Sequence, residues 1–197
     1  MTELRRRSFL QPAFAGLSTA LLAQVSNVAT TRKAVRVLAG TDREREKRAV
    51  VSSTTYKVVT QETGSDLFVM EQLNHTKDGP PCHLHHPQDE LFYTLEGEHI
   101  FEVDGERFHL KAGDCVLDPR GIAHAWAFIG DTTGKLLTSF TPAGKMEAFF
   151  NEREKLGIKP GHDATTSAYA AMMHDFEMEL VGPPLALNGS PASGTKH

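Results

Sequence analysis

The sequence has little cysteine, no long apolar run and no excess of positive charge, and each absence excludes a class of protein. The two cysteines in 197 residues, Cys82 and Cys115, cannot build a disulfide framework; they are buried thiols or, in an exported protein, one bridge. No apolar run is long enough for a stable membrane span. A formal net charge of −4 argues against nucleic acid as the main partner.

The chain also lacks the signatures of several common folds. There is no internal repeat, no strand–helix alternation of the kind that builds a parallel sheet, and no glycine-rich phosphate loop after a strand. Short candidate strands separated by glycine and proline turns predict instead an all-β domain, a closed sheet or jelly roll. Besides the strand that carries His83, the expected strands are Tyr56–Thr60, Asp66–Leu73, Glu90–Leu95, Glu98–Val103, Arg107–Leu110, Asp114–Leu117, His124–Ile129 and Leu136–Thr141.

Composition divides the chain into five expected parts. Residues 1–29 resemble a twin-arginine export signal: Arg-Arg-Arg-Ser-Phe-Leu-Gln precedes a segment rich in Ala, Ser and Leu, although Gln11 replaces the usual Lys. This predicts a periplasmic or secreted protein, with a cytoplasmic protein that has an N-terminal helix as the alternative. The remaining parts are a charged linker at 30–49, the β-barrel at 50–143, two helices and a strand at 144–186, and a disordered tail at 187–197. The helices are expected to pack outside the barrel.

One segment and one downstream residue concentrate side chains that bind metals. His83 and His85 are two residues apart, so both imidazoles point to the same face of a strand. A tight turn then allows Glu90, which opens the next strand, to return beside them. A lone His-x-His is common at wet strand ends, but His124 follows a Pro-x-Gly turn in the same way and is the natural fourth ligand. Three imidazoles and one carboxylate suit one divalent transition metal: iron, manganese, nickel, cobalt, copper or zinc.

These residues resemble the two sequence motifs of small bacterial cupins. The first motif corresponds to His83, His85, Glu90 and Gly97. The second motif corresponds to Gly113, Pro119, Gly121 and His124. Two positions differ, because Phe128 stands where the second motif has Asn, and the leading glycine of the first would fall at Lys77, with Gly79 nearby but out of register. The resemblance covers residues 56–143 and implies the cupin double-stranded β-helix, a jelly-roll barrel, with the metal held by the three histidines and Glu90.

Strand alternation extends the prediction from the ligands to a substrate pocket. If Glu90 and His124 point into the barrel, so do the residues two and four positions further on, which are Phe92, Thr94, Trp126 and Phe128. They either contact a ligand or simply fill the barrel. The outward set Leu91, Tyr93 and Leu95 needs cover from an N-terminal strand or a second copy, which predicts a homodimer. His99 lacks ligand spacing and is expected to be a surface or packing residue.

The ligand spacing is similar to that of the quercetin dioxygenase-like cupins. This resemblance implies a dioxygenase that cleaves an aromatic or enolic small molecule, with Glu90 as the catalytic group that takes the proton of the substrate. Two alternatives stay open. A metal without redox chemistry would favour an isomerase, epimerase or decarboxylase, and a third possibility is a small-molecule or metal binder without turnover.

Overall fold

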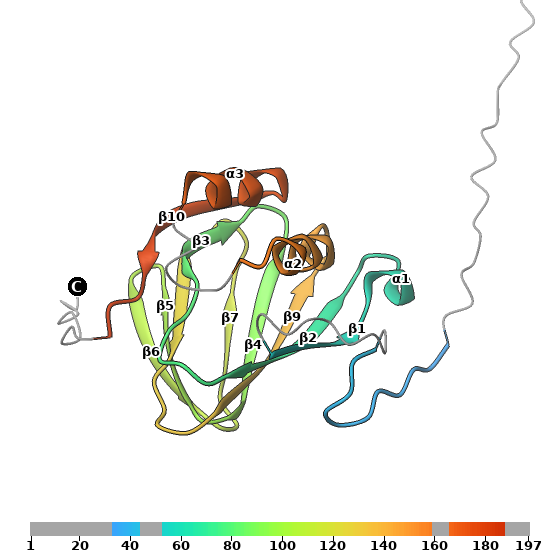
Figure 1. Ribbon diagram of the computed structural model, residues 1–197, viewed down its shortest axis with the longest axis horizontal. Helices are drawn as coiled ribbons and strands as arrows, with labels where there is room; N and C mark the ends of the chain where they lie inside the picture. Colours follow the sequence, from blue (N-terminus) through green and yellow to red (C-terminus); the bar gives the residue numbers. More distant parts are fainter. Residues whose placement is uncertain (1–32, 44–52, 159–165, 188–197) are drawn as a thin grey trace, which may run out of the picture. The chain divides into compact units, whose positions relative to one another are not determined.

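The computed structural model describes residues 33–43, 53–158 and 166–187, and in these ranges the strands form two five-stranded antiparallel sheets (Figure 1). The first sheet contains, in spatial order, β1 (Ser53–Val58), β2 (Phe68–Asn74), β9 (Gly134–Thr141), β4 (Asp89–Glu96) and β7 (Cys115–Asp118). The second contains β10 (Met178–Pro184), β3 (Pro81–His85), β8 (His124–Phe128), β5 (Glu98–Val103) and β6 (Glu106–Lys111). From β3 to β10 the chain passes repeatedly from one sheet to the other, as in a jelly roll.

Strand β4 shows the alternation that the sequence predicted. Glu90, Phe92 and Thr94 are buried, whereas the residue that follows each of them is about two-fifths exposed on the outer face. Those outer residues are Leu91, Tyr93 and Leu95. The described residues therefore leave this side of β4 partly exposed, and the homodimer stays a prediction.

Strand β8 is buried on both faces, unlike a simple inside–outside strand. The segment before β3 runs beside it: the Phe128 N–H donates to the Asp78 carbonyl at 3.0 Å. Gly79 lies against the backbone of Trp126 so closely that a Cβ there would be 1.8 Å from the Trp126 carbonyl oxygen. The segment at 78–79 is thus packed backbone to backbone on the strand that begins with His124.

Three helices complete the described chain. Helix α1 (Thr60–Thr63) is a single turn between β1 and β2, and α2 (Met146–Lys155) and α3 (Ser167–Asp175) lie together at one end of the sheets (Figure 1). Thr166 caps α3 by accepting the Tyr169 N–H at 3.2 Å. The helices bury their apolar sides against the barrel, so the expected external packing is confirmed. The shared core contains Tyr56, Val59, Phe68, Met70, Phe140, Ala143, Met146, Phe149, Phe150, Tyr169, Met172, Met173 and Met178. Each large side chain in it contributes roughly 1.5–3 kcal/mol to stability.

A second, smaller core fills the barrel between the sheets and surrounds one histidine. It contains Phe92, Phe101, Leu110, Trp126 and Leu136. His99 on β5 is fully buried beside it, with ring centroids 6.0 Å from Trp126 and 5.4 Å from Phe128. Burial lowers the pKa of His99 to about 4, so the imidazole is neutral at pH 7. The sequence left His99 as either a surface residue or a packing residue, and the structure shows that it is a packing residue.

The neutral state of His99 predicts an acid-sensitive stability. The unfolded chain takes up a proton at a pKa near 6.5 and the folded one only near 4, so stability falls as the pH drops from 6.5 to 4, by at most ~3 kcal/mol from this residue. Urea unfolding of the metal-free protein across this range should show a shallower pH dependence for His99→Gln. The control is His75→Gln, at an exposed position. An unchanged slope in His99→Gln would assign the effect to other groups.

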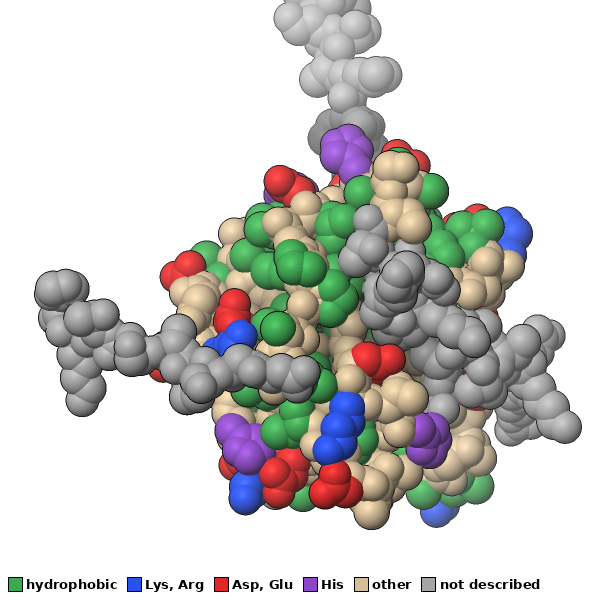
Figure 2. Space-filling model, turned by 60° about the vertical axis from the view of Figure 1, so that its left-hand side comes forward, with side chains coloured by type: hydrophobic (Ala, Val, Ile, Leu, Met, Phe, Trp, Pro, Cys, Tyr) green, Lys and Arg blue, Asp and Glu red, His purple; other side chains and the backbone are tan. Residues whose placement is uncertain are grey.

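Several expectations concern features away from the barrel interior. Cys82 and Cys115 are both free thiols, so the structure holds no bridge between them. No helix among the described residues is long and apolar enough to cross a membrane. The expected export signal at 1–29 and residues 188–197 of the expected tail at 187–197 lie outside the described residues. On the face shown in Figure 2, the described acidic, basic and histidine side chains are mixed with one another, and the basic ones form no continuous area.

Candidate metal centre

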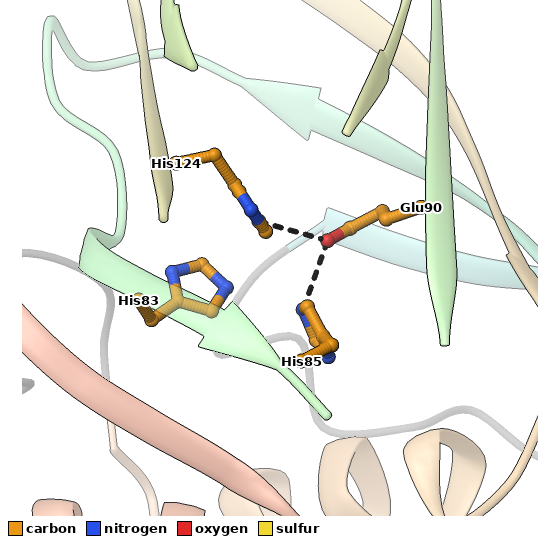
Figure 3. Close-up of side chains that lie close together, drawn as sticks. All are labelled: His83, His85, Glu90 and His124. Atoms are coloured by element: carbon orange, nitrogen blue, oxygen red, sulfur yellow. Dashed lines mark ion pairs between the residues drawn. The ribbon is translucent and has the colours of Figure 1, made fainter. Parts of the chain in front are cut away.

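Three strands bring the four predicted ligands together. Strand β3 carries His83 and His85 on its inner face, and its single register pair with β8 sets His83 opposite His124. Glu90 comes from the start of β4 in the other sheet. All four residues are buried. The exposed fraction is 8% for His83, 2% for His85, 4% for Glu90 and 1% for His124. Figure 3 shows the side chains converging on one point inside the barrel.

The distances within the cluster are those of groups that share a cation. One ligand atom from each residue lies within 4.8 Å of all the others. Glu90 Oε2 is 3.0 Å from His85 Nε2 and 3.3 Å from His124 Nε2. All three atoms are buried, and none has a partner in hydrogen-bonding geometry among the residues that the structure describes. Because unsatisfied buried polar atoms are costly, a metal ion at their point of convergence fits this donor set.

Backbone carbonyls fix two of the imidazole rings from behind. His83 Nδ1 lies 2.8 Å from the Pro81 oxygen, and His124 Nδ1 lies 3.2 Å from the Ile122 oxygen. A carbonyl can only accept, so each Nδ1 carries the proton and donates it. The Nε2 lone pair of each ring is then free for a metal, which is the usual outer support of metal-binding histidines.

The pKa values of the clustered residues are shifted by burial and by their mutual contacts. Burial acts to raise the pKa of Glu90, but the close contacts of its carboxylate with the imidazoles of His124 and His85 outweigh burial and hold this pKa at about 2. Burial, with the neighbouring imidazoles, moves the pKa of His83 well below its usual 6.5. For His124 the interaction with Glu90 outweighs burial and raises the pKa. At neutral pH the cluster therefore contains an ionised carboxylate and a neutral His83, the forms that bind metals, whereas a metal that binds His124 must displace the proton that Glu90 favours there.

A cavity opens beside the ligands and is roofed by the C-terminal helices. Its cavity volume is about 60 Å³, and it is partly open to solvent. The barrel side of its wall includes His83, His85, Glu90, Trp126 and Phe140. The roof consists of Met146, Phe149, Phe150 and Arg153 from α2 with Tyr169 and Met173 from α3. Polar side chains at the remaining edge are Gln72, Asn74 and Asp78.

Only one of the four predicted pocket residues borders this cavity. Trp126 lines it, whereas Phe92, Thr94 and Phe128 are buried elsewhere in the barrel. Phe92 packs on Phe101 in the core between the sheets, with ring centroids 5.0 Å apart, and Phe128 packs on His99. Strand alternation identifies which side chains point inward, but not how far along the barrel each one lies from the cavity.

The sequence reasoning missed the residues of the roof and one buried carboxylate. Arg153 and Tyr169 line the cavity from helices that begin more than twenty residues after the last ligand, and no local pattern places them over it. Asp118 on β7 has an exposed fraction of 1%, and its Oδ2 lies 3.9 Å from His124 Nε2. Burial and the charge of Glu90 raise the pKa of Asp118 to about 7, against the opposing effect of His124. Its one signal in the sequence was its place as a carboxylate directly after the expected strand Asp114–Leu117.

Comparison with known proteins supports the fold assignment. Residues 69–140 match the profile of the cupin domain family, a range from β2 to β9 that includes all four clustered residues. An uncharacterised protein of Methanocaldococcus jannaschii is 33% identical over 60 residues, which make up 30% of this chain and 48% of that protein. The match therefore spans about half the length of this curated relative.

Several solved structures are also similar. An RmlC-like cupin from Shewanella frigidimarina is 25% identical, over 48% of this chain and 78% of that chain, with a TM-score of 0.41. A double-stranded β-helix protein from Klebsiella pneumoniae is 19% identical, over 56% of this chain and 92% of that chain, with a TM-score of 0.43. The two antiparallel sheets and the cupin-domain match together confirm the expected all-β cupin fold.

Proposed function

We propose that this cupin is a metal-dependent dioxygenase that cleaves an enolic or phenolic small molecule bound in the cavity. The observation that carries the proposal is the buried cluster of three histidines and Glu90, three of whose members border a cavity with an aromatic wall. Four protein ligands leave positions open on a six-coordinate metal, and an open position distinguishes a catalytic site from a structural one. A flat substrate with adjacent oxygens suits both the open positions and the aromatic wall.

The proposed reaction is balanced with dioxygen as the only co-substrate. An enediol, R–C(OH)=C(OH)–R′, reacts with O₂ to give R–COOH and R′–COOH. The carbon–carbon double bond and the O–O bond break, and each carbon gains one oxygen atom. The substrate supplies the four electrons that reduce the dioxygen, so no external reductant is needed.

Glu90 is the residue we assign as the proton acceptor. It borders the cavity, and its pKa of about 2 keeps it ionised at neutral pH. So weak a base accepts a proton only from an acidified group, and a bound divalent metal supplies this by lowering the pKa of a coordinated hydroxyl. Trp126, Phe149 and Phe150 offer apolar faces that hold a planar substrate and exclude water.

A second candidate function keeps the metal and omits dioxygen. Gln72, Asn74 and Arg153 also line the cavity, and polar groups of this kind can hold a sugar or an oxo acid. The chain would then be a non-redox isomerase, epimerase or decarboxylase. A small-molecule or metal binder without turnover is the remaining alternative.

The test begins with the metal content of the purified full chain and continues with an oxygen electrode. We expect one equivalent of a divalent transition metal per chain, and oxygen consumption on addition of flavonols or other enediols. Glu90→Gln should reduce kcat by at least about 100-fold, because the proton acceptor is lost. Glu96→Gln, on the same strand but exposed, is the matched control. Turnover of a sugar or oxo acid without oxygen consumption would replace the dioxygenase with the second candidate.

A further inference from the structure

Asp118 is a second carboxylate beside the candidate metal centre, and in the described part of the chain it has no hydrogen-bond partner. It ends β7 directly opposite Glu90 in the antiparallel register of β4 and β7, so both side chains point into the barrel. Its exposed fraction is 1%, and neither carboxylate oxygen has a hydrogen-bond partner. The nearest charged partner is His124, whose Nε2 lies 3.9 Å from Asp118 Oδ2.

This placement is costly in a protein without a nearby cation. A buried carboxylate without hydrogen bonds loses its hydration and gains nothing in return. Two carboxylates directly opposite each other on neighbouring strands add repulsion between like charges. A divalent cation held by the three histidines and Glu90 would make the buried charge of Asp118 favourable. The two positive charges of the cation and the one negative charge of Glu90 leave a net charge of +1 in a buried site. A second carboxylate neutralises that charge.

We propose that Asp118 belongs to the metal centre as an outer carboxylate, which supplies the second negative charge from outside the ligand set. The inference rests on the metal centre of the proposed function. Asp118 is not one of the four residues whose ligand atoms converge, and it is not among the cavity-lining residues. It therefore acts on the metal through its charge, and does not touch the substrate.

The experiment measures Co²⁺ binding to the metal-stripped full chain by calorimetry. Asp118→Asn is expected to weaken the affinity by about 10–100-fold, as loss of an outer partner of a metal ligand does. Asp104→Asn is the matched control: it makes the same change of charge at an exposed turn whose φ of +52° asparagine tolerates. Its affinity should equal that of the wild type. The thermal unfolding of each metal-free variant is recorded in parallel, since a merely structural role would lower this stability without changing the affinity of folded protein.

A second variant keeps the test decisive if Asp118→Asn does not fold. Asp118→Leu places an apolar side chain of similar size in the buried site and is expected to fold at least as stably without metal, yet to bind Co²⁺ more weakly. Wild-type affinity in the folded variants would overturn the role of Asp118 and leave the metal centre intact. Absence of Co²⁺ binding by the wild type would overturn the metal centre itself, and with it this inference.

Discussion

Replacing His85 with alanine is expected to lower the affinity for divalent metals by at least 100-fold. The residue is 2% exposed, and its Nε2 lies 3.0 Å from Glu90 Oε2 at the centre of the cluster. Loss of an outer partner already costs 10–100-fold in metal affinity, so loss of a ligand should cost at least as much. Elemental analysis of protein purified in parallel, followed by Co²⁺ titration of the stripped proteins, measures the effect.

The same substitution should remove the stabilisation that the metal provides. A ligand that binds only the folded state adds about 2.7 kcal/mol when its concentration is 100 times the dissociation constant. At a metal concentration that gives the wild type this gain, His85→Ala should gain less than about 0.5 kcal/mol in thermal or urea unfolding.

The neighbouring histidine provides the control for this prediction. His86 is the next residue, but its side chain is more than half exposed and faces Glu179, 3.9 Å away, outside the cluster. His86→Ala should bind metal as the wild type does. Equal metal content in His85→Ala and His86→Ala would contradict the site, because a true ligand and its exposed neighbour cannot be equivalent.

The four clustered residues could be predicted from the sequence because short-range geometry places them. Two residues of spacing put His83 and His85 on one face of β3, and the turns before Glu90 and His124 set each at the start of a returning strand. Such features depend only on strand periodicity and turn chemistry, which are local properties of the chain.

The roof of the cavity and the partners of the core could not be predicted in this way. Arg153 and Tyr169 reach the cavity only because α2 and α3 pack on the end of the barrel, a contact between distant segments that leaves no periodic signal. Phe128 was expected to line the pocket, but it packs on His99 instead, since alternation fixes a side chain's face and not its neighbours. Asp118 shows the same limit, because its proximity to His124 depends on the pairing of β7 with β4.

The structure explains why residue 79 is a glycine, which the cupin motif did not. In the sequence it lies near the expected leading glycine of the first cupin motif, but out of register. In the structure a Cβ on Gly79 would lie 1.8 Å from the Trp126 carbonyl oxygen and 2.7 Å from its carbon. Both atoms belong to the backbone, so no side-chain rotation can relieve the overlap. The backbone of β8 or of the 78–79 segment would have to move.

Gly79→Ala is therefore expected to destabilise the protein by about 3 kcal/mol, at the upper end of the usual cost of overpacking. Because Gly79 and Trp126 both line the cavity, the displacement should also alter the indole fluorescence of Trp126, the only tryptophan. Urea unfolding of the metal-free protein measures the first effect, and the emission spectrum of the folded variant measures the second.

Gly182→Ala is the matched control, since a Cβ there meets nothing closer than the Cys82 Cβ at 3.5 Å, an ordinary van der Waals distance. It should change stability by less than about 1 kcal/mol and leave the Trp126 emission unchanged. Equal stabilities for the two alanine variants would mean that the 78–79 segment does not pack on β8 as the structure has it. A loss confined to Gly79→Ala would show that this backbone contact, next to the strand that presents His124, holds one wall of the cavity in place.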